Sequence, residues 1–227
     1  MAKAHIEVND IATAIQAYDS AYGRFPVSPN AQTIAINNAK KLGNPNGDFT
    51  YGAMFADSTG TLFARGTPSG SSCITNSEVI GILMDYTNYP NGSGSTMNTN
   101  YERNPQKTIF LNAHMSGWDP SQGGTPLPGV GNDLVYRDPW GNPYLITMDL
   151  NYDEQCQDTV YCQNAVSGLN KTSANPGLNG LVNPNNAPNN FQYHGKVMVW
   201  SAGPDGKIDI TQQANQGVNK DNVLSWQ

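Results

Sequence analysis

Charged side chains are scarce in this sequence. Lys, Arg, Asp and Glu together make up 13% of the 227 residues, against an average of about 25% in globular proteins. Acidic residues outnumber basic ones, which leaves a net charge of −6. A surface of this sign repels phosphate groups, so we expect neither nucleic acid nor an anionic membrane surface as a partner. The same charge is compatible with the binding of cations.

Long apolar runs and cysteines are also few. No segment approaches the roughly 18 apolar residues of a membrane-spanning helix, and no secretory signal peptide is recognisable. The three cysteines allow one bridge. Cys156 and Cys162 lie six residues apart in a loop-like region and could form a disulfide, which would leave Cys73 as a buried thiol in an exported protein. Free thiols in a cytosolic protein are the alternative.

Motifs of known enzyme classes are missing. The histidines His5, His114 and His194 are far apart in the sequence, no His or Cys pair has metal-ligand spacing, and no Gly-x-Ser-x-Gly element occurs. Each histidine is better explained as structural than as catalytic. We therefore predict that the chain is not an enzyme. A glycosidase that uses two of the scattered carboxylates is the enzymatic alternative.

The residue types that are abundant in this sequence favour turns. There are 23 Gly and 15 Pro, with abundant Asn, and 21 aromatic residues as 4 Trp, 11 Tyr and 6 Phe. So many aromatic side chains can form a core. The length of 227 residues allows one large domain or two small ones, and the composition favours short strands and long ordered loops over a helical bundle.

Residues 2–22 carry the clearest pattern. Apolar side chains recur at steps of three and four, which places them on one side of a helix; they are Ala4, Val8, Ile11, Ile15, Tyr18 and Tyr22. Gly23 supplies a left-handed end and Pro26 prevents continuation. The helix would be roughly 30 Å long. The polar residues off this stripe are expected to face water; they are Glu7, Asp10, Thr13, Gln16 and Asp19.

The beginning of this helix lacks a cap. Residues 1–4 enter the apolar pattern with no Ser, Thr, Asp or Asn ahead of it. Our hypothesis is a cut helix whose upstream part has been removed. The alternative is a helix that frays at a free terminus.

Other elements follow from the same rules. A capping box is expected at Thr75 and Glu78, opening a helix that stops before Pro90. The Asp-Pro-Trp-Gly-Asn-Pro run at 138–143 predicts the turn of a hairpin that spans 134–150. The remaining expectations are a helix over 31–42, a weak hairpin within 49–65 with turns at 57–60 and near Gly66, strands at 108–111 and 196–201, a helical turn within 153–166, and loops over 91–100, 117–132, 170–190 and 202–227.

Two acidic stretches are candidates for a hard cation. Residues 149–153 (Asp-Leu-Asn-Tyr-Asp) place oxygens at alternate positions, as a calcium loop does, but Glu154 stands where Gly is needed and Val160 where Glu is needed. We interpret this stretch as a solvated strand end.

The second stretch follows the last strand. Its candidate ligands are carboxylates, amide oxygens and carbonyls that a Gly-rich loop can turn inward; they are Ser201, Asp205, Asp209, Asp221 and Asn222, with Ala202 as a further carbonyl. Ordinary Asp-Gly turn chemistry is the alternative explanation.

Three motifs together resemble one family. Residues 17–26 (Ala-Tyr-Asp-Ser-Ala-Tyr-Gly-Arg-Phe-Pro) are similar to the Tyr…Gly-Arg-Tyr/Phe-Pro exit of the spine helix in major pseudopilins of type II secretion, within the type IV pilin-like class. Residues 138–144 resemble the hairpin of that family. Residues 201–206 and 221–226 resemble its Ser-x-Gly-x-Asp-Gly … Asp-Ile-x-Asn-Trp ending.

The resemblance implies a single domain of α+β class over residues 1–227. In this fold a long N-terminal helix (2–22) packs on a small antiparallel sheet, with an insertion over 31–133 and a sheet with a C-terminal loop over 134–227. It also implies calcium in that loop. Asp205 matches a family ligand, Asp221 or Asn222 matches the second acidic position, carbonyls near Ser201 contribute, and Asp209 has no counterpart.

The resemblance further implies a structural role. The chain would be a subunit of a type IV pilus or type II secretion pseudopilus. It would be anchored in the inner membrane through a missing hydrophobic half-helix, processed by prepilin peptidase, and then assembled into a periplasmic or extracellular filament. Partners would be other subunits and the inner-membrane assembly machinery. The alternative is an adhesin, with residues 90–132 forming a glycan-binding face on a pilin scaffold.

Overall fold

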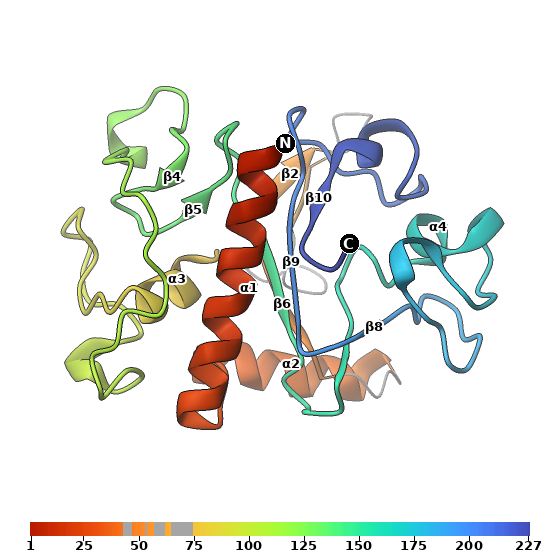
Figure 1. The fold of residues 1–227 in the computed structure, drawn as a ribbon, viewed down its shortest axis with the longest axis horizontal. Helices are drawn as coiled ribbons and strands as arrows, with labels where there is room; N and C mark the ends of the chain where they lie inside the picture. The colour runs from red at the N-terminus through yellow and green to blue at the C-terminus, as the bar shows by residue number, and fades with distance from the viewer. Residues whose placement is uncertain (43–46, 53, 57–61, 65–74) are drawn as a thin grey trace.

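The computed structural model describes residues 1–42, 47–52, 54–56, 62–64 and 75–227. It is of α+β class, with an N-terminal helix and a small antiparallel sheet (Figure 1), as predicted. Cys73 and the turns expected at 57–60 and near Gly66 lie outside the described residues. No helix in the described part of the chain is both long and apolar enough to cross a membrane.

The central sheet joins strands that are far apart in the sequence. Its order is β1 (Phe49–Tyr51), β6 (Leu145–Met148), β9 (Val197–Ser201) and β10 (Val223–Leu224), and all neighbours are antiparallel. The strands predicted at 144–150 and 196–201 are confirmed. β1 falls within the range expected as an insertion, so part of that range completes the sheet.

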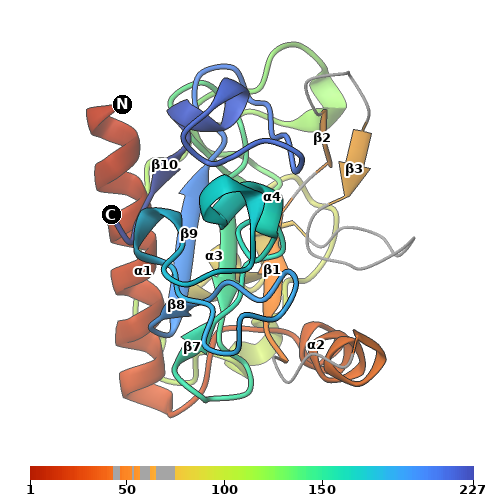
Figure 2. The ribbon, with the colours of Figure 1, turned by 90° about the vertical axis from the view of Figure 1, so that its right-hand side faces the viewer.

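Helix α1 (Ala2–Tyr22) packs against β9 and β10, and Figure 2 shows it running alongside these strands. Its stripe is almost fully buried: Ala4, Val8, Ile11, Ala14, Ile15 and Tyr18 are each at most 3% exposed. Burial of each large apolar side chain is worth about 1.5–3 kcal/mol. Gly23 ends the helix with a φ of 63°, and no side chain caps the first turn. Both features agree with the sequence predictions.

Glu7 corrects one expectation on this helix. It was expected to face water, yet it is 8% exposed and its carboxylate accepts a hydrogen bond of 2.6 Å from the Tyr144 hydroxyl. Glu7 lies three residues after Ala4 and four before Ile11, so it stands at the edge of the buried stripe. The hydrogen bond from this hairpin hydroxyl offsets part of the free-energy cost of burying the carboxylate.

The sheet separates two cores. Val197 and Val199 point into a core shared with α1 and with α3 (Ser77–Leu83), whereas Met198 and Trp200 point into a second core. Irregular chain between 156 and 214 covers that second side. In Figure 1, α3 lies to the left of the sheet and the short helix α4 (Asn164–Ser167) to the right.

The capping box is wrong. Helix α3 begins at Ser77 with Asn76 as its N-cap residue, and the Asn76 side chain makes no capping hydrogen bond. Glu78 instead accepts a hydrogen bond of 3.2 Å from the Tyr51 hydroxyl. Asn76 is fully buried and its amide exchanges hydrogen bonds with the backbone of Tyr136 and Tyr144. The helix start is therefore fixed by the hairpin and not by its own side chains.

The strand expected at 108–111 is also wrong. The N–H groups of Phe110 and Leu111 both donate to the carbonyl of Leu83, the last residue of α3. Ile109 is 65% exposed. The short apolar run is thus used to cover the end of a helix, a role that apolar sequence alone does not distinguish from a strand.

The hairpin at 134–150 is confirmed. Asp138 N–H donates to the carbonyl of Asn142, and Tyr144 N–H donates to that of Tyr136. The incoming strand, β5 (Tyr136–Arg137), also pairs with β4 (Gly129–Val130), which makes the otherwise irregular 117–132 region part of the hairpin's support.

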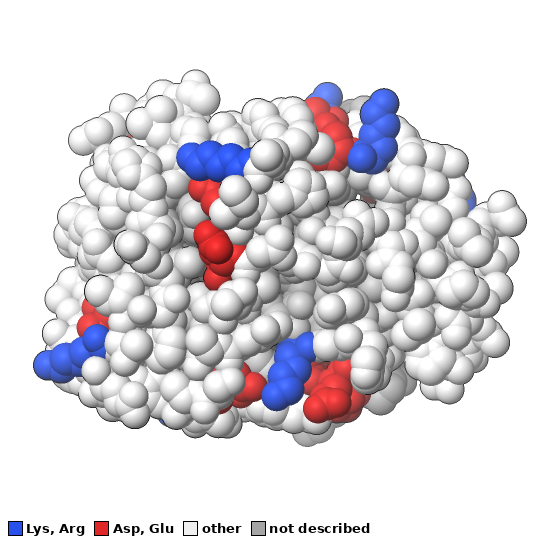
Figure 3. Space-filling view, in the orientation of Figure 1, with Lys and Arg blue, Asp and Glu red and all other residues white. Residues whose placement is uncertain are grey.

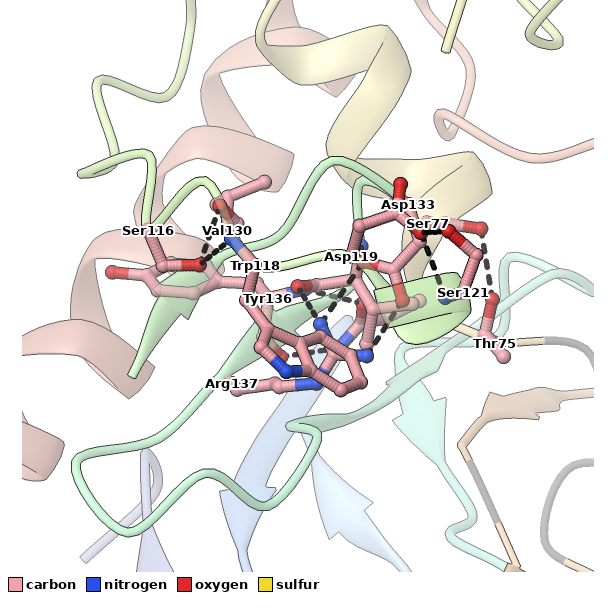
Figure 4. A network of polar contacts seen from close by, with 12 residues as sticks. Thr75, Ser77, Ser116, Trp118, Asp119, Ser121, Val130, Asp133, Tyr136 and Arg137 are labelled. Carbon is pink, nitrogen blue, oxygen red and sulfur yellow. Dashed lines mark hydrogen bonds and ion pairs between the residues drawn. The ribbon is translucent and has the colours of Figure 1, made fainter. Parts of the chain in front are cut away.

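A polar network fastens this region (Figure 4). Arg137 is 6% exposed, and its guanidinium makes two hydrogen bonds, of 3.0 and 2.6 Å, to the carboxylate of Asp133. The guanidinium also lies over the ring of Trp118, 4.5 Å from its centroid. A bidentate and stacked arginine of this kind fixes the orientation of the segments that it joins.

Cys156 is a buried thiol and is not bonded to Cys162. Of the two alternatives for this pair, the disulfide is therefore not formed. The two lie on different elements, because Cys156 belongs to a strand and Cys162 to the turn that follows.

The other elements are α2 (Pro29–Leu42), the hairpin of β2 (Met54–Ala56) and β3 (Leu62–Ala64), the pair β7 (Gln155–Cys156) and β8 (Tyr193–His194), and the 3₁₀ turns η1 (Thr99–Tyr101), η2 (Pro120–Gln122), η3 (Leu169–Lys171), η4 (Leu178–Gly180) and η5 (Gly217–Asp221).

Candidate functional site

The C-terminal loop brings two of the predicted ligands together. After β9 the chain runs out through Asp205, returns through η5 and enters β10. Burial, and then the charge of Asp205, raises the pKa of the Asp221 carboxyl. Gly203 makes this approach feasible, since its φ is 70° and a Cβ there would stand 2.5 Å from the carbonyl oxygen of Asp221.

Two oxygens in this loop lack hydrogen-bond donors among the described residues. The Oδ1 atoms of Asp221 and Asn222 are buried and have no hydrogen-bond partner in that part of the chain, while the Asn222 amide nitrogen donates to the Tyr161 hydroxyl at 3.0 Å. A buried acceptor without a partner costs about 1–3 kcal/mol. A hard cation with oxygen ligands would remove that cost and the repulsion between Asp205 and Asp221, so the residues present fit calcium.

The other predicted ligands have structural partners. Ser201 donates to a carboxylate oxygen of Asp138 at 2.6 Å and accepts from Gly203 N–H at 3.0 Å. Asp209 is buried, and its Oδ1 accepts from the N–H and the hydroxyl of Thr211. These two side chains hold the shape of the loop. Within the described ranges, no three or more Asp, Glu, His or Cys side chains form a group that could hold a metal ion.

The hairpin turn is the anchor of this loop. Asn142 donates to the carbonyl of Gly203 at 2.9 Å, and Asp138 receives the Ser201 hydroxyl. Burial raises the pKa of the Asp138 carboxyl. The motifs at 138–144 and 201–206 are thus parts of one assembly. Each motif is recognisable in the sequence, but the hydrogen bonds between them are not, because they join residues about sixty positions apart.

The first acidic stretch also departs from expectation. Asp149 is fully buried, and its carboxylate accepts the N–H groups of Asp153 and Glu154 at 3.2 and 2.8 Å. The interpretation as a solvated strand end is therefore wrong for Asp149, although Asp153 is exposed. The backbone N–H groups replace the water that would otherwise surround the charge.

The outer side of α1 is a candidate contact surface. Figure 3 shows that the face carrying α1 is largely uncharged, with its few acidic and basic side chains lying next to one another in small groups. Ile6 projects from this side and is 62% exposed. A hollow of about 330 Å³ lies between α1 and the irregular chain beside it, lined by Asp10, Thr13, Ala14, Ala17, Phe110, Leu111 and Asn112. Its lining is partly apolar and partly polar, as is common where one protein surface packs against another.

Comparison with known proteins leaves the resemblance to rest on these motifs alone. No protein-family model, no curated protein sequence and no solved structure matches this chain.

Proposed function

We propose that this chain is the globular part of a pilin-like structural subunit, which assembles through its N-terminal helix into a pilus or a type II secretion pseudopilus. The observation that carries the proposal is the position of α1, which lies along β9 and β10 with one buried stripe and one exposed side. In this role the protein acts by assembly and not by catalysis.

The geometry of α1 supports this role. Its first turn has no side-chain cap and stands at a corner of the molecule (Figure 2), so a helix continuing upstream would leave the body without a clash at that corner. An apolar continuation would anchor the subunit in the inner membrane before assembly. The exposed side of α1, with Ile6, would then contact neighbouring subunits in a periplasmic or extracellular filament.

A test separates folding from assembly. In the full-length protein, in a cell with its own assembly machinery, Ile6→Asp should leave folding intact because Ile6 is exposed, and should abolish filaments seen by electron microscopy. Leu169→Asp is the matched control, because Leu169 is also exposed, at 45%, but lies in η3, away from α1. Normal filaments from Ile6→Asp, or filament loss from both variants, would contradict the proposed contact.

We extend the proposal to calcium, held by Asp205, Asp221 and the Asn222 amide oxygen. The ion would supply charge compensation and fix the loop on the hairpin. Saturation a hundredfold above Kd would stabilise the folded chain by about 2.7 kcal/mol. Melting curves with EGTA and with added calcium measure this shift.

The control for calcium is a neutral variant. Asp221→Asn should remove the calcium-dependent shift in Tm, whereas Asp10→Asn, an exposed carboxylate on α1, should preserve it. Protons compete with the metal for a carboxyl whose pKa is raised, so the shift should weaken as the pH falls. Equal Tm in EGTA and calcium would refute the metal site and would leave the proposal about α1 standing.

A further inference from the structure

A polar hollow lies on the segment between α3 and η1. It measures about 180 Å³ and is lined by Thr87, Asn88, Ser95, Thr99, Asn100 and Tyr101. None of these side chains carries a charge. The lining therefore offers hydroxyl and amide groups, which both donate and accept hydrogen bonds, around one aromatic ring.

A buried polar network holds the walls of the hollow in place. Asp85 accepts hydrogen bonds from the amides of Asn98 and Asn104 at 3.1 and 3.0 Å. Both asparagines are fully buried, and Asn98 in turn accepts the N–H of Asn104 at 2.9 Å. Such a satisfied network makes a loop rigid before any ligand arrives, which lowers the entropic cost of binding.

The aromatic ring stands on a strained backbone. Asn100 and Tyr101 have φ values of 54° and 60°, a region that is unusual for a bulky side chain. The Lys107 ammonium lies 4.0 Å from the centroid of the Tyr101 ring and restrains it by a cation–π contact. Strain of this kind, maintained by the surrounding structure, is concentrated at functional sites.

We propose that this hollow binds a neutral sugar ring of a glycan. A pyranose carries hydroxyl groups around its edge and C–H groups on its faces. The Asn, Ser and Thr side chains match the hydroxyls, and the face of the Tyr101 ring that Lys107 does not cover would take a C–H face. The six lining side chains are uncharged and match a neutral sugar; because the Lys107 ammonium lies over the Tyr101 ring, the test includes an acidic glycoside.

The hollow would stay accessible in a filament. Tyr22 donates to the side-chain oxygen of Asn104 at 2.7 Å, and Arg24 donates to the carbonyl of Glu102 at 3.1 Å. These bonds attach the segment to the C-terminal end of α1, roughly 30 Å from its first turn, and Figure 1 shows the segment on the left of the molecule. Binding requires only the isolated chain, so it can be tested independently of assembly.

The test is a titration of the isolated protein with neutral methyl glycosides of glucose, galactose, mannose, N-acetylglucosamine and N-acetylgalactosamine, followed by amide NMR shifts. We expect at least one glycoside to shift the signals of residues 87–101 at millimolar concentration. Tyr101→Asn, which tolerates the left-handed backbone, should weaken that binding at least about tenfold. Tyr101→Gly also suits this backbone and should weaken binding in the same way. If both variants keep the Tm of the parent chain, the loss of binding is not caused by unfolding.

Tyr152→Asn is the matched control. Tyr152 is a 49% exposed tyrosine, also with positive φ, at 60°, on a loop that does not line the hollow, so its substitution should leave glycoside affinity unchanged. The proposal is overturned if no neutral glycoside shifts these signals, if only a sialic acid methyl glycoside does, or if Tyr101→Asn binds as tightly as the parent chain.

Discussion

The two faces of the central sheet are held by different interactions. On the side of α1, strands β1, β6 and β9 present Phe49, Ile146 and Val199 to the core that α1 shares with α3. On the opposite side the same strands present Thr50, Thr147 and Trp200 to irregular chain. The first layer depends on apolar burial against a helix, whereas the second combines an apolar core with directed hydrogen bonds.

Asp158 shows how the second layer is built. One carboxylate oxygen accepts from the Thr147 hydroxyl at 2.6 Å and from the Trp200 indole at 3.0 Å. The other accepts from the backbone N–H groups of Val160 and Tyr161. A single buried carboxylate thus ties the irregular chain to two strands of the sheet, beside the apolar core on the same side. Regular structure can be replaced by loops when one acceptor satisfies several buried donors.

The largest effect is expected on the helical side. Ile15→Asp places a charge at a site that is fully buried, and we expect the variant not to fold, because an unpaired buried charge costs more than a small domain's margin of stability. Ile6→Asp, on the exposed side of the same helix, should change stability by no more than about 0.5 kcal/mol. Circular dichroism melting measures both. A native transition in Ile15→Asp would break the comparison, since burial of the stripe would then not be what holds this face.

A smaller but still large effect is expected on the loop side. Asp158→Ala leaves four buried donors without their acceptor and should destabilise the fold by about 3–5 kcal/mol in urea unfolding. Asp158→Asn retains an acceptor oxygen and should cost less. The exposed Asp153→Ala is the control. Should Asp158→Ala cost no more than that control, the loop side would be held by its apolar residues after all.

The smallest effect has the opposite sign. Burial, and then the charges of Asp149 and Asp153, raise the pKa of Asp48 well above the usual value for an aspartate. Because the folded pKa is the higher one, this group's contribution to stability is complete below the unfolded pKa of about 3.9 and declines as the pH rises through the folded pKa. At neutral pH, Asp48→Asn should therefore stabilise the chain by about 1 kcal/mol.

The pH dependence sharpens that expectation. Asn can still accept the N–H of Gln157, which bonds to Asp48 at 2.6 Å, so the substitution removes charge and keeps geometry. The gain in Tm should shrink toward zero as the pH approaches 4, where the parent carboxyl is protonated as well. Asp10→Asn, at an exposed position, should show no such trend. A loss of stability at every pH would mean that the Gln157 bond requires the charge.

The contrast also explains what the sequence could predict. The spacing of Val8, Ile11 and Ile15 predicts the helix and its buried side, because periodic burial is a local property. The turn at 138–143 is equally local. The capping box, the strand at 108–111 and the exposure of Glu7 are wrong because each was decided by a distant partner: Asn76 by the hairpin, Leu111 by the end of α3, and Glu7 by Tyr144.

The candidate site follows the same division. The sequence predicted Asp205, Asp221 and Asn222 in one loop, and in the structure Asp205 lies close enough to Asp221 for its charge to raise the pKa of the Asp221 carboxyl. The sequence did not indicate that the side chains of Ser201 and Asp209 form hydrogen bonds with Asp138 and Thr211. Side-chain hydrogen bonds within a loop depend on backbone directions, which residue spacing does not determine.

Strand β9 has one more consequence. Its five residues are all buried, with Val197 and Val199 in one core and Met198 and Trp200 in the other. Both cores therefore share this strand. If β9 left the sheet, both cores would lose part of their packing at the same time. The molecule should consequently melt as one unit, without a half-molten intermediate that keeps either layer intact.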